Sequence, residues 1–423
     1  MLTLKLLQEN KTEVIERLRI KSFDATALVD RIIELDNKRK ATQTESDNLQ
    51  AEMNRLSKSI GQLMKNKELA EAEAAKARTA GLKDEIKELT TTLDSIEKEL
   101  QQLLVQLPNL PHQSVPAGKG AEDNVIVREG GKKPELKDAL PHWELARKYD
   151  IIDFELGVKL TGAGFPVYKG KGARLQRALI SFFLNEAEAA GYLEVQPPLM
   201  VNEDSGYGTG QLPDKEGQMY HVGLDNLYLI PTAEVPVTNI YRDVILNGDQ
   251  FPIKNCAYSA CFRREAGSYG KDVRGLNRLH QFDKVEIVQV ARPDDSYKVL
   301  EEMVKHVQGL VDKLELPWRI VKLCGGDMSF TSALTYDFEV FSAAQERWLE
   351  VSSVSNFESF QANRLKLRYR EDSNSKPQLA HTLNGSALAL PRIVAALLEN
   401  NQTEDGIRIP KVLVPYCGFD IIK

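Results

Sequence analysis

The residues with the clearest chemical potential lie in one run near the middle of the chain, from Ala260 to Glu286. The run reads as a strand, a glycine-containing loop and a returning strand. Because side chains alternate between the faces of a strand, one sheet face would present a guanidinium, two carboxylates and an aromatic ring, from Arg263, Glu265, Glu286 and Phe282. A guanidinium binds phosphate oxygens, an aromatic ring stacks on adenine, and a carboxylate accepts from an amine. Such a face suits ATP and a zwitterion, although cross-strand salt bridges on a solvated face would give a similar pattern.

Two other common kinds of site are missing from the sequence. Neither a GxxxxGK[ST] loop nor a strand-linked GxGxxG turn occurs, so phosphate must be held in another way. The six histidines are scattered without an HExxH pattern, and the four cysteines, Cys256, Cys261, Cys324 and Cys417, form no CxxC pair. We therefore expect no zinc site and buried free thiols.

Three longer segments match a known family in order along the chain. FRRE at Phe262–Glu265 resembles motif 2 of the class II aminoacyl-tRNA synthetases, and the run through HQFDKVE is similar to that of the zinc-independent, bacterial-type seryl-tRNA synthetases. Gly191–Met200 resembles motif 1, the homodimer segment of that class. Gly385–Arg392 resembles motif 3, with alanine at 387 and 389 where the class prefers glycine and Pro391 where it prefers an acid. Alanine is still small, and proline in the first turn of a helix loses no needed hydrogen bond.

Shorter segments point to the amino acid. Pro231–Glu234 resembles the serine-binding TxE loop of the seryl enzymes, although a TxE sequence alone is more often a helix cap. Glu350–Ser353 resembles their metal and ATP segment, and Thr382–Ser386 resembles their serine pocket.

The resemblance implies a serine–tRNA ligase. Such an enzyme activates L-serine with ATP to seryl-adenylate, releases pyrophosphate, and transfers the seryl group to the 3′ end of tRNA(Ser), and in this family also of tRNA(Sec). It implies catalytic roles for Arg263, Glu286 and Arg392. It implies serine contacts from Thr232, Ala233, Glu234, Glu286, Asn384 and Ser386. It implies ATP contacts from Arg263, Arg264, Glu265, Phe282, Glu350, Val351, Ser352, Ser353 and Arg392, with Mg²⁺ on Glu350 and Ser353.

A second part of the sequence, from about residue 28 to 105, is rich in Glu, Lys, Ala, Leu and Gln and free of proline. Apolar residues recur there in steps of four and three, at Leu49, Met53, Leu56, Ile60 and Leu63, and again from Leu82 to Leu103. The pattern predicts an antiparallel helical hairpin that reverses between Lys65 and Gly81. At about 1.5 Å per residue, an arm of about 35 residues would project on the order of 50 Å. A dimerisation coiled coil and an arm that reaches a large partner both fit. The resemblance favours tRNA, with candidate contacts at Lys38, Arg39, Lys40, Arg55, Lys58 and Lys76.

The sequence after the helical hairpin predicts an α+β catalytic domain. Leu107–Asn124 is dense in proline and glycine and reads as a linker. Strand-like runs follow in meander order with helices around them, which favours an antiparallel sheet. We expect strands at Leu227–Ile230, Ala257–Arg264, Leu279–Val290 and Trp318–Leu323, and helices at Ala173–Ala190, Ser296–Leu314 and Leu388–Asn400. The domains expected are an N-terminal tRNA-binding domain at 1–106, a linker at 107–140 and a class II catalytic domain at 141–423.

Length and composition limit the alternatives. The chain has 423 residues, 42% hydrophobic and 27% charged, which suits a globular protein of two or three domains. A formal net charge of −6 excludes an indiscriminate polyanion-coating protein. No apolar run is long enough to span a bilayer, and the N-terminus lacks a signal sequence, so we expect a cytoplasmic protein.

Three other functions are weighed against the serine–tRNA ligase. An amino acid ligase that loads a carrier protein would lack the helical arm. A phenylalanyl-tRNA synthetase would lack the PTAE loop and the polar pocket. A non-catalytic protein on a decayed synthetase fold would tolerate loss of Arg263, Glu286, Glu350 or Arg392, and all four are present.

Overall fold

The computed structural model describes residues 1–214, 217–265 and 274–423. These residues divide into two compact units, one of residues 1–19 and 23–108 and the other of residues 20–22 and 109–423. Most of the glycine-containing loop predicted between the two motif strands falls on residues 266–273 and lies outside the described ranges.

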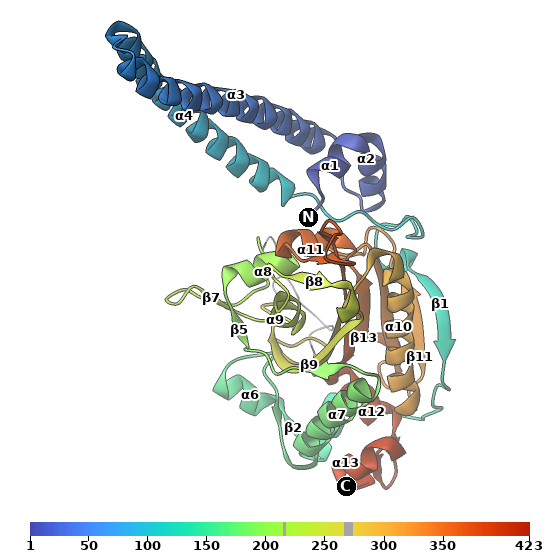
Figure 1. Cartoon of the computed structure of the whole chain (residues 1–423). Coiled ribbons are helices and arrows are strands. Elements are labelled where there is room, and N and C mark those ends of the chain that lie inside the picture. The colour runs from blue at the N-terminus through green and yellow to red at the C-terminus, as the bar shows by residue number, and fades with distance from the viewer. Residues whose placement is uncertain (215–216, 266–273) are drawn as a thin grey trace. The chain divides into compact units, whose positions relative to one another are not determined.

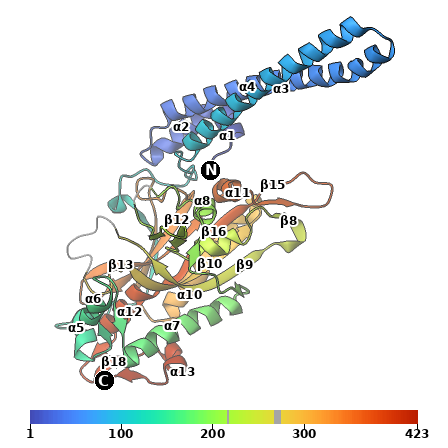
Figure 2. The same ribbon diagram turned by 90° about the vertical axis from the view of Figure 1, so that its left-hand side faces the viewer.

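The first unit is helical (Figure 1). Its elements are α1 (Leu4–Glu9), α2 (Lys11–Ile20), α3 (Thr26–Lys65) and α4 (Leu69–Leu104). The long helices α3 and α4 lie antiparallel, as Figure 2 shows, and the predicted helical hairpin is confirmed. The turn lies within the predicted stretch: residues 66–68 reverse the chain, and residues 69–81 already belong to α4. Ala72 and Ala75 are buried there, because small side chains let the two helices approach closely near the turn.

The hairpin is held by an apolar seam with charged pairs beside it. Leu93, Ile96 and Leu100 of α4 are buried, at the spacing that the sequence indicates. Arg78 of α4 pairs with Glu52 of α3 at 3.0 Å between Nε and Oε1. Both partners are partly exposed, so the apolar seam contributes more to stability than this pair does.

The second unit is built on an eight-stranded sheet. In spatial order the strands are β1 (Val125–Gly130), β11 (Trp318–Lys322), β12 (Leu334–Ser342), β13 (Arg347–Asn356), β16 (His381–Ala389), β10 (Gln281–Ala291), β9 (Ile253–Phe262) and β4 (Leu193–Glu194). All neighbours are antiparallel except β4 and β9. The α+β prediction is confirmed. However, β1 lies within the predicted linker, because pairing with β11 gives it a backbone partner that its local sequence does not reveal.

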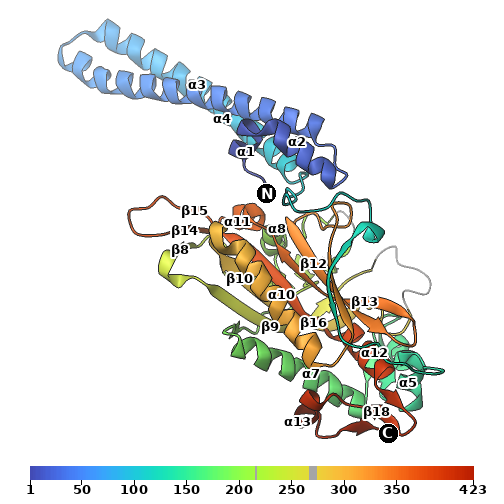
Figure 3. The same cartoon turned by 90° about the vertical axis from the view of Figure 1, so that its right-hand side faces the viewer.

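Three helices pack on one face of this sheet: α7 (Gly170–Ala189), α10 (Ser296–Lys313) and α12 (Leu390–Asn400). Figure 3 shows α7 and α10 running across that face. Val285 and Ile287 of β10 are buried in the same core, whereas the alternate residues Phe282, Lys284 and Glu286 line a cavity. The period-two pattern of β10 therefore separates a helix-covered face from a face that is open to ligands.

Smaller elements complete the second unit. They are α5 (His142–Lys148), β2 (Ile152–Asp153), α6 (Phe154–Leu160), β3 (Val167–Tyr168), β5 (Met200–Val201), α8 (Glu203–Thr209), β6 (His221–Val222), β7 (Leu227–Leu229), α9 (Glu234–Asn239), β8 (Ile245–Asn247), α11 (Ser359–Leu365), β14 (Arg368–Arg370), β15 (Gln378–Leu379), β17 (Gln402–Thr403), β18 (Gly406–Arg408), α13 (Val414–Cys417) and β19 (Ile421–Ile422). Several form short two- and three-stranded sheets beside the main one.

All four cysteines are free and buried in the second unit, as predicted. Burial raises the pKa of Cys256 to about 12 and that of Cys417 to about 11. Within the described ranges, no three His, Cys, Asp or Glu side chains gather into a group that could hold a metal ion. Over the same residues, every helix is too short or too polar to cross a membrane.

Candidate active site

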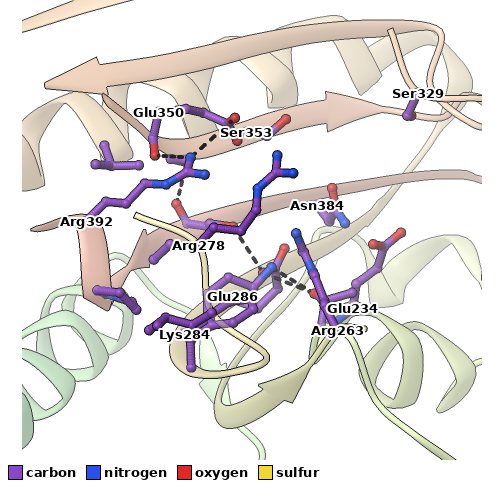
Figure 4. Close-up of a pocket in the computed structure, with 18 of the residues that line it drawn as sticks. Glu234, Arg263, Arg278, Lys284, Glu286, Ser329, Glu350, Ser353, Asn384 and Arg392 are labelled. Atoms are coloured by element: carbon purple, nitrogen blue, oxygen red, sulfur yellow. Dashed lines mark hydrogen bonds and ion pairs between the residues drawn. The ribbon is translucent and has the colours of Figure 1, made fainter. Parts of the chain in front are cut away.

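A cavity of about 400 Å³ opens on the sheet face opposite the three helices. Figure 4 shows side chains from several strands pointing into it. It collects nearly all the site residues predicted from the sequence: Thr232, Glu234, Arg263, Glu265, Phe282, Glu286, Glu350, Val351, Ser352, Ser353, Asn384, Ser386 and Arg392. Residues more than a hundred positions apart in the chain are thus brought together by the order of the strands.

Two predicted residues are placed elsewhere. Ala233 is fully buried and packs against Val237, Ala257 and Val288. Arg264 lines a separate pocket, with its guanidinium 6.0 Å from the centre of the Tyr220 ring. Arg264 follows the end of β9, and its backbone N–H donates to the Gln218 carbonyl at 2.9 Å.

One end of the cavity is built from carboxylates and hydroxyls. Lys284, which was not among the predicted site residues, forms an ion pair with Glu286 and donates to Thr232 Oγ1 at 2.9 Å. The hydroxyls of Thr232 and Ser386 each lie 3.4 Å from Glu286 Oε2. The buried charge of Glu286 is therefore compensated by Lys284 and by two hydroxyl donors.

Glu234 lies at the same end, and two amide side chains bind its carboxylate. Gln361 Nε2 donates to Glu234 Oε1 at 2.7 Å, and Asn384 also hydrogen bonds to this carboxylate. Burial, and then the negative charge of Glu286, raise the pKa of Glu234 to about 7. A cation that entered here would favour the ionised form and would itself be held by it.

The guanidinium of Arg263 lies beside Glu234, whereas Arg392 lies toward the other end of the cavity, beside Glu350 (Figure 4). Arg263 donates from Nε to the Pro231 carbonyl at 3.3 Å, and its guanidinium lies 5.2 Å from the centre of the Phe282 ring. Arg392 donates from Nη1 to the Glu350 carbonyl at 2.7 Å. Arg278, which was not among the predicted site residues, forms an ion pair with Glu265 at 3.4 Å between Nε and Oε2. Planar cations in this arrangement suit a polyphosphate.

The predicted strand geometry around Arg263 and Glu265 is wrong in one respect. The strand β9 ends at Phe262, two residues before the predicted end, and Glu265 has a φ of +50°. Arg263 still pairs through its N–H with the His280 carbonyl at 2.9 Å. The Glu265 side chain thus enters the cavity because the backbone turns there, not because a strand alternates.

Oxygen ligands for a divalent cation lie on β13. Glu350 and Ser353 line the cavity, and Asp337 of β12 pairs across the strands with Ser353. One oxygen of Asp337, Oδ1, is buried without a hydrogen-bond partner. Burial, and then the charge of Glu350, raise the pKa of Asp337 well above its usual value. A set of carboxylate and hydroxyl oxygens with an unpaired buried oxygen beside it fits a hard cation such as Mg²⁺.

A loop between β11 and β12 also lines the cavity, through Ser329 and Thr331. Lys21 donates from Nζ to the carbonyl of Ser329 at 2.9 Å, and Asn109 donates from Nδ2 to that of Thr331 at 2.9 Å. Burial lowers the pKa of Lys21 to about 7. This loop could not be predicted from the sequence, because its residues show no periodicity and its position depends on distant residues.

Comparisons with known proteins agree with this geometry. Residues 1–111 match the family model for the seryl-tRNA synthetase N-terminal domain, and residues 220–401 match the class II tRNA synthetase core domain for G, H, P, S and T. The chain is 52% identical over 421 residues to a serine–tRNA ligase of Salinibacter ruber, which covers 99% of this chain and 98% of that protein. The chain belongs to the seryl-tRNA synthetase family. The resemblance inferred from the motifs is confirmed, and with it the assignment as a class II aminoacyl-tRNA ligase.

Other seryl-tRNA synthetases match along the whole length. A serine–tRNA ligase of Chlorobaculum parvum is 47% identical, with 100% of both chains covered. The solved structure of the seryl-tRNA synthetase from Pyrococcus horikoshii complexed with ATP superposes with a TM-score of 0.89, at 34% identity, over 100% of this chain and 99% of that one. Pro391, the departure from the usual motif 3, lies in the first turn of α12 as expected, and Arg392 follows it into the cavity.

Proposed function

We propose that this cavity activates L-serine with ATP and that the chain then passes the seryl group to the 3′ end of tRNA(Ser), and also of tRNA(Sec). One observation carries the proposal: Glu234 and Glu286 lie at one end of the cavity with the Arg263 guanidinium beside them, and Arg392 lies toward the other end, beside Glu350 (Figure 4). A small zwitterion with a hydroxyl fits the first end and a triphosphate fits the second. Their reacting groups then meet between them.

The serine end is proposed to read both the ammonium and the hydroxyl of the amino acid. Glu234 pairs with the ammonium, assisted by Glu286, whose charge is already shared with Lys284. The serine hydroxyl hydrogen bonds to Thr232, Asn384 and Ser386. Alanine is disfavoured because it leaves these buried groups unpaired, at about 1–3 kcal/mol for each.

The ATP end is proposed to neutralise charge during the in-line attack of the serine carboxylate on the α-phosphorus. Arg263 binds the α-phosphate and Arg392 the γ-phosphate, so charge that develops in the displacement meets a preorganised cation. Phe282 stacks on adenine and Glu265 accepts from its amino group. Val351 and Ser352 line the same wall of the cavity.

Mg²⁺ is proposed to be held by Glu350 and Ser353 together with the ATP phosphates. When bound, it neutralises phosphate charge and orients the triphosphate. The support is the all-oxygen donor set and the unpaired oxygen of Asp337 beside it. No zinc ligands are proposed.

The first unit is proposed to bind tRNA through the α3–α4 hairpin, with the protein acting as a cytoplasmic homodimer. Recognition by shape does not require a basic protein, so the acidic net charge is compatible with this role. Of the candidate basic residues, Arg39 and Lys40 already pair with the buried Asp36. Lys38, Arg55, Lys58 and Lys76 are the remaining exposed candidates.

The test is ATP–pyrophosphate exchange with each amino acid, followed by charging of tRNA(Ser). We expect exchange that depends on serine, and seryl-tRNA as the product. Exchange with another amino acid and none with serine would refute the assignment. Exchange with serine but transfer only to a carrier protein would favour the alternative ligase.

A further inference from the structure

A buried histidine–glutamate pair belongs to none of the groups assigned above. His142 opens α5 and Glu399 lies near the end of α12, and both are fully buried. His142 Nδ1 lies 2.7 Å from Glu399 Oε1, and the backbone N–H of His142 donates to the same oxygen at 3.0 Å. Ser342 donates to the other carboxylate oxygen. Burying so polar a pair costs free energy, which raises the question of what it positions.

The hydrogen bonds fix which nitrogen of His142 carries the proton. The backbone N–H of Leu276 donates to His142 Nε2 at 2.8 Å, so Nε2 is an acceptor and Nδ1 is the donor to Glu399. Glu399 accepts hydrogen bonds from His142 Nδ1, from the His142 backbone N–H and from Ser342, and these donors favour its ionised form. An ionised Glu399 thus holds the ring as a neutral acceptor for Leu276.

The backbone next to this contact leaves no room for another arrangement. Gly275 has a φ of +65°, and a Cβ at this position would lie 2.2 Å from His142 Nε2. The chain therefore runs directly against the imidazole ring. Leu276 and Asn277, the next two residues, line the cavity.

Asn277 carries the connection to the proposed ATP site. Its carbonyl accepts from Arg392 Nε at 3.0 Å, while its side chain donates to Gln345 Oε1 at 3.0 Å. Gln345 Nε2 in turn donates to Glu399 Oε1 at 3.0 Å. Asn277 is thus tied to Glu399 on two sides, once through Leu276 and His142 and once through Gln345.

We propose that His142 is a positioning residue for ATP. The pair His142–Glu399 holds the Leu276 N–H in position. It thereby also holds the position of the neighbouring Asn277 carbonyl, which accepts from Arg392 and orients its guanidinium. The inference rests on the proposed role of Arg392 at the γ-phosphate. It assigns to a fully buried histidine an effect on ATP and none on serine, whose proposed contacts lie at the other end of the cavity.

The test compares two substitutions that separate the nitrogens of the ring. In His142→Asn the amide reaches the position of Nδ1 and keeps a donor for Glu399, but Leu276 loses its acceptor. In His142→Gln the amide reaches the position of Nε2 and offers an oxygen to Leu276. We expect His142→Asn to raise both the calorimetric Kd and the KM for ATP about tenfold, or about 1.4 kcal/mol. We expect His142→Gln to stay within about threefold of the unsubstituted protein, and the KM for serine to stay within about twofold in both.

Controls separate positioning from a general loss of structure. His306→Asn changes a half-buried histidine, which contacts Tyr192 and lies outside the cavity lining, and should leave the binding of both substrates unaffected. Arg392→Ala tests the proposed function itself. If Arg392→Ala weakens ATP binding and His142→Asn does not, the positioning role is wrong. If Arg392→Ala has no effect on ATP, the assignment of the γ-phosphate is wrong instead.

Two further measurements complete the test. The double variant His142→Asn, Arg392→Ala should bind ATP no more weakly than Arg392→Ala alone, since both changes act through one contact. Should His142→Asn fail to fold, Gln345→Leu removes the second tie at a half-buried position, and we expect ATP Kd to rise about threefold. Unchanged ATP binding in Gln345→Leu, or equal weakening of ATP and serine in either His142 variant, would overturn the proposal.

Discussion

Serine binding should depend on pH through Glu234. Burial, together with the charge of Glu286, raises the pKa of Glu234 to about 7, so this carboxyl is largely protonated at pH 6 and largely ionised at pH 8. Only the ionised form can pair with the serine ammonium, which stays protonated over this range. Serine affinity should therefore rise as the pH rises through 7.

The size of the effect follows from the pKa. One pH unit below it about one-tenth of the groups are ionised, and one unit above it about nine-tenths are, so the KM for serine should fall about tenfold from pH 6 to pH 8. Glu234→Gln keeps the volume and the oxygen that accepts from Gln361 Nε2. It removes the charge, so we expect a higher KM at pH 8 and a nearly flat profile. The assay is ATP–pyrophosphate exchange at saturating ATP.

The same substitution should change stability with the sign set by proton binding. The folded chain binds the proton of Glu234 more tightly than the unfolded chain, so stability falls as the pH rises from about 4.5 to about 7. The difference between these values corresponds to about 3 kcal/mol. The free energy of unfolding of the unsubstituted chain should therefore fall between pH 5 and pH 8, and in Glu234→Gln this fall should be smaller. Tryptophan fluorescence can follow unfolding of the second unit, which contains Trp143, Trp318 and Trp348. A flat serine profile in the unsubstituted protein, or the same slope in Glu234→Gln, would refute this reasoning.

Three other outcomes are expected. Arg263→Ala should lower serine-dependent exchange about 10²–10³-fold because a preorganised cation at the α-phosphate is lost, and near-normal exchange would remove Arg263 from that role. Glu350→Ala should raise the Mg²⁺ concentration required for half-maximal exchange about 10–100-fold. An unchanged Mg²⁺ dependence would show that Glu350 is not a ligand of the cation. Replacing residues 30–102 by a short connector should spare exchange and abolish tRNA charging, whereas intact charging would show that the hairpin is not the tRNA-binding element.

The catalytic face could be predicted from sequence because its signal is local. Phe282, Lys284 and Glu286 alternate with the buried Val285 and Ile287 on one strand, and this period is visible without any partner. The helical hairpin was equally accessible, since its seam repeats within each helix. Buried free cysteines were expected because the four cysteines form no CxxC pair.

What the sequence did not reveal depends on distant partners. The strand β1 is defined by pairing with β11, almost two hundred residues away, and its own text resembles a loop. In the sequence Lys284 is an ordinary charged residue of a strand, and its role becomes visible only from its contacts with Glu286 and Thr232 in the structure. The same holds for Gln361, whose contact with Glu234 requires α11 to pack against α8 and β16. Burial and pKa shifts arise only from such assembly.

The distribution of the thiols has a practical consequence for following the helical hairpin in solution. All four cysteines lie in the second unit and are buried, and burial raises the pKa of Cys256, Cys261 and Cys417, so little reactive thiolate forms there near neutral pH. The first unit contains no cysteine. A cysteine introduced at the exposed Glu68, in the turn of the hairpin, would therefore react selectively with a maleimide dye. A single fluorophore can therefore be attached at the tip of the hairpin without first substituting the native cysteines.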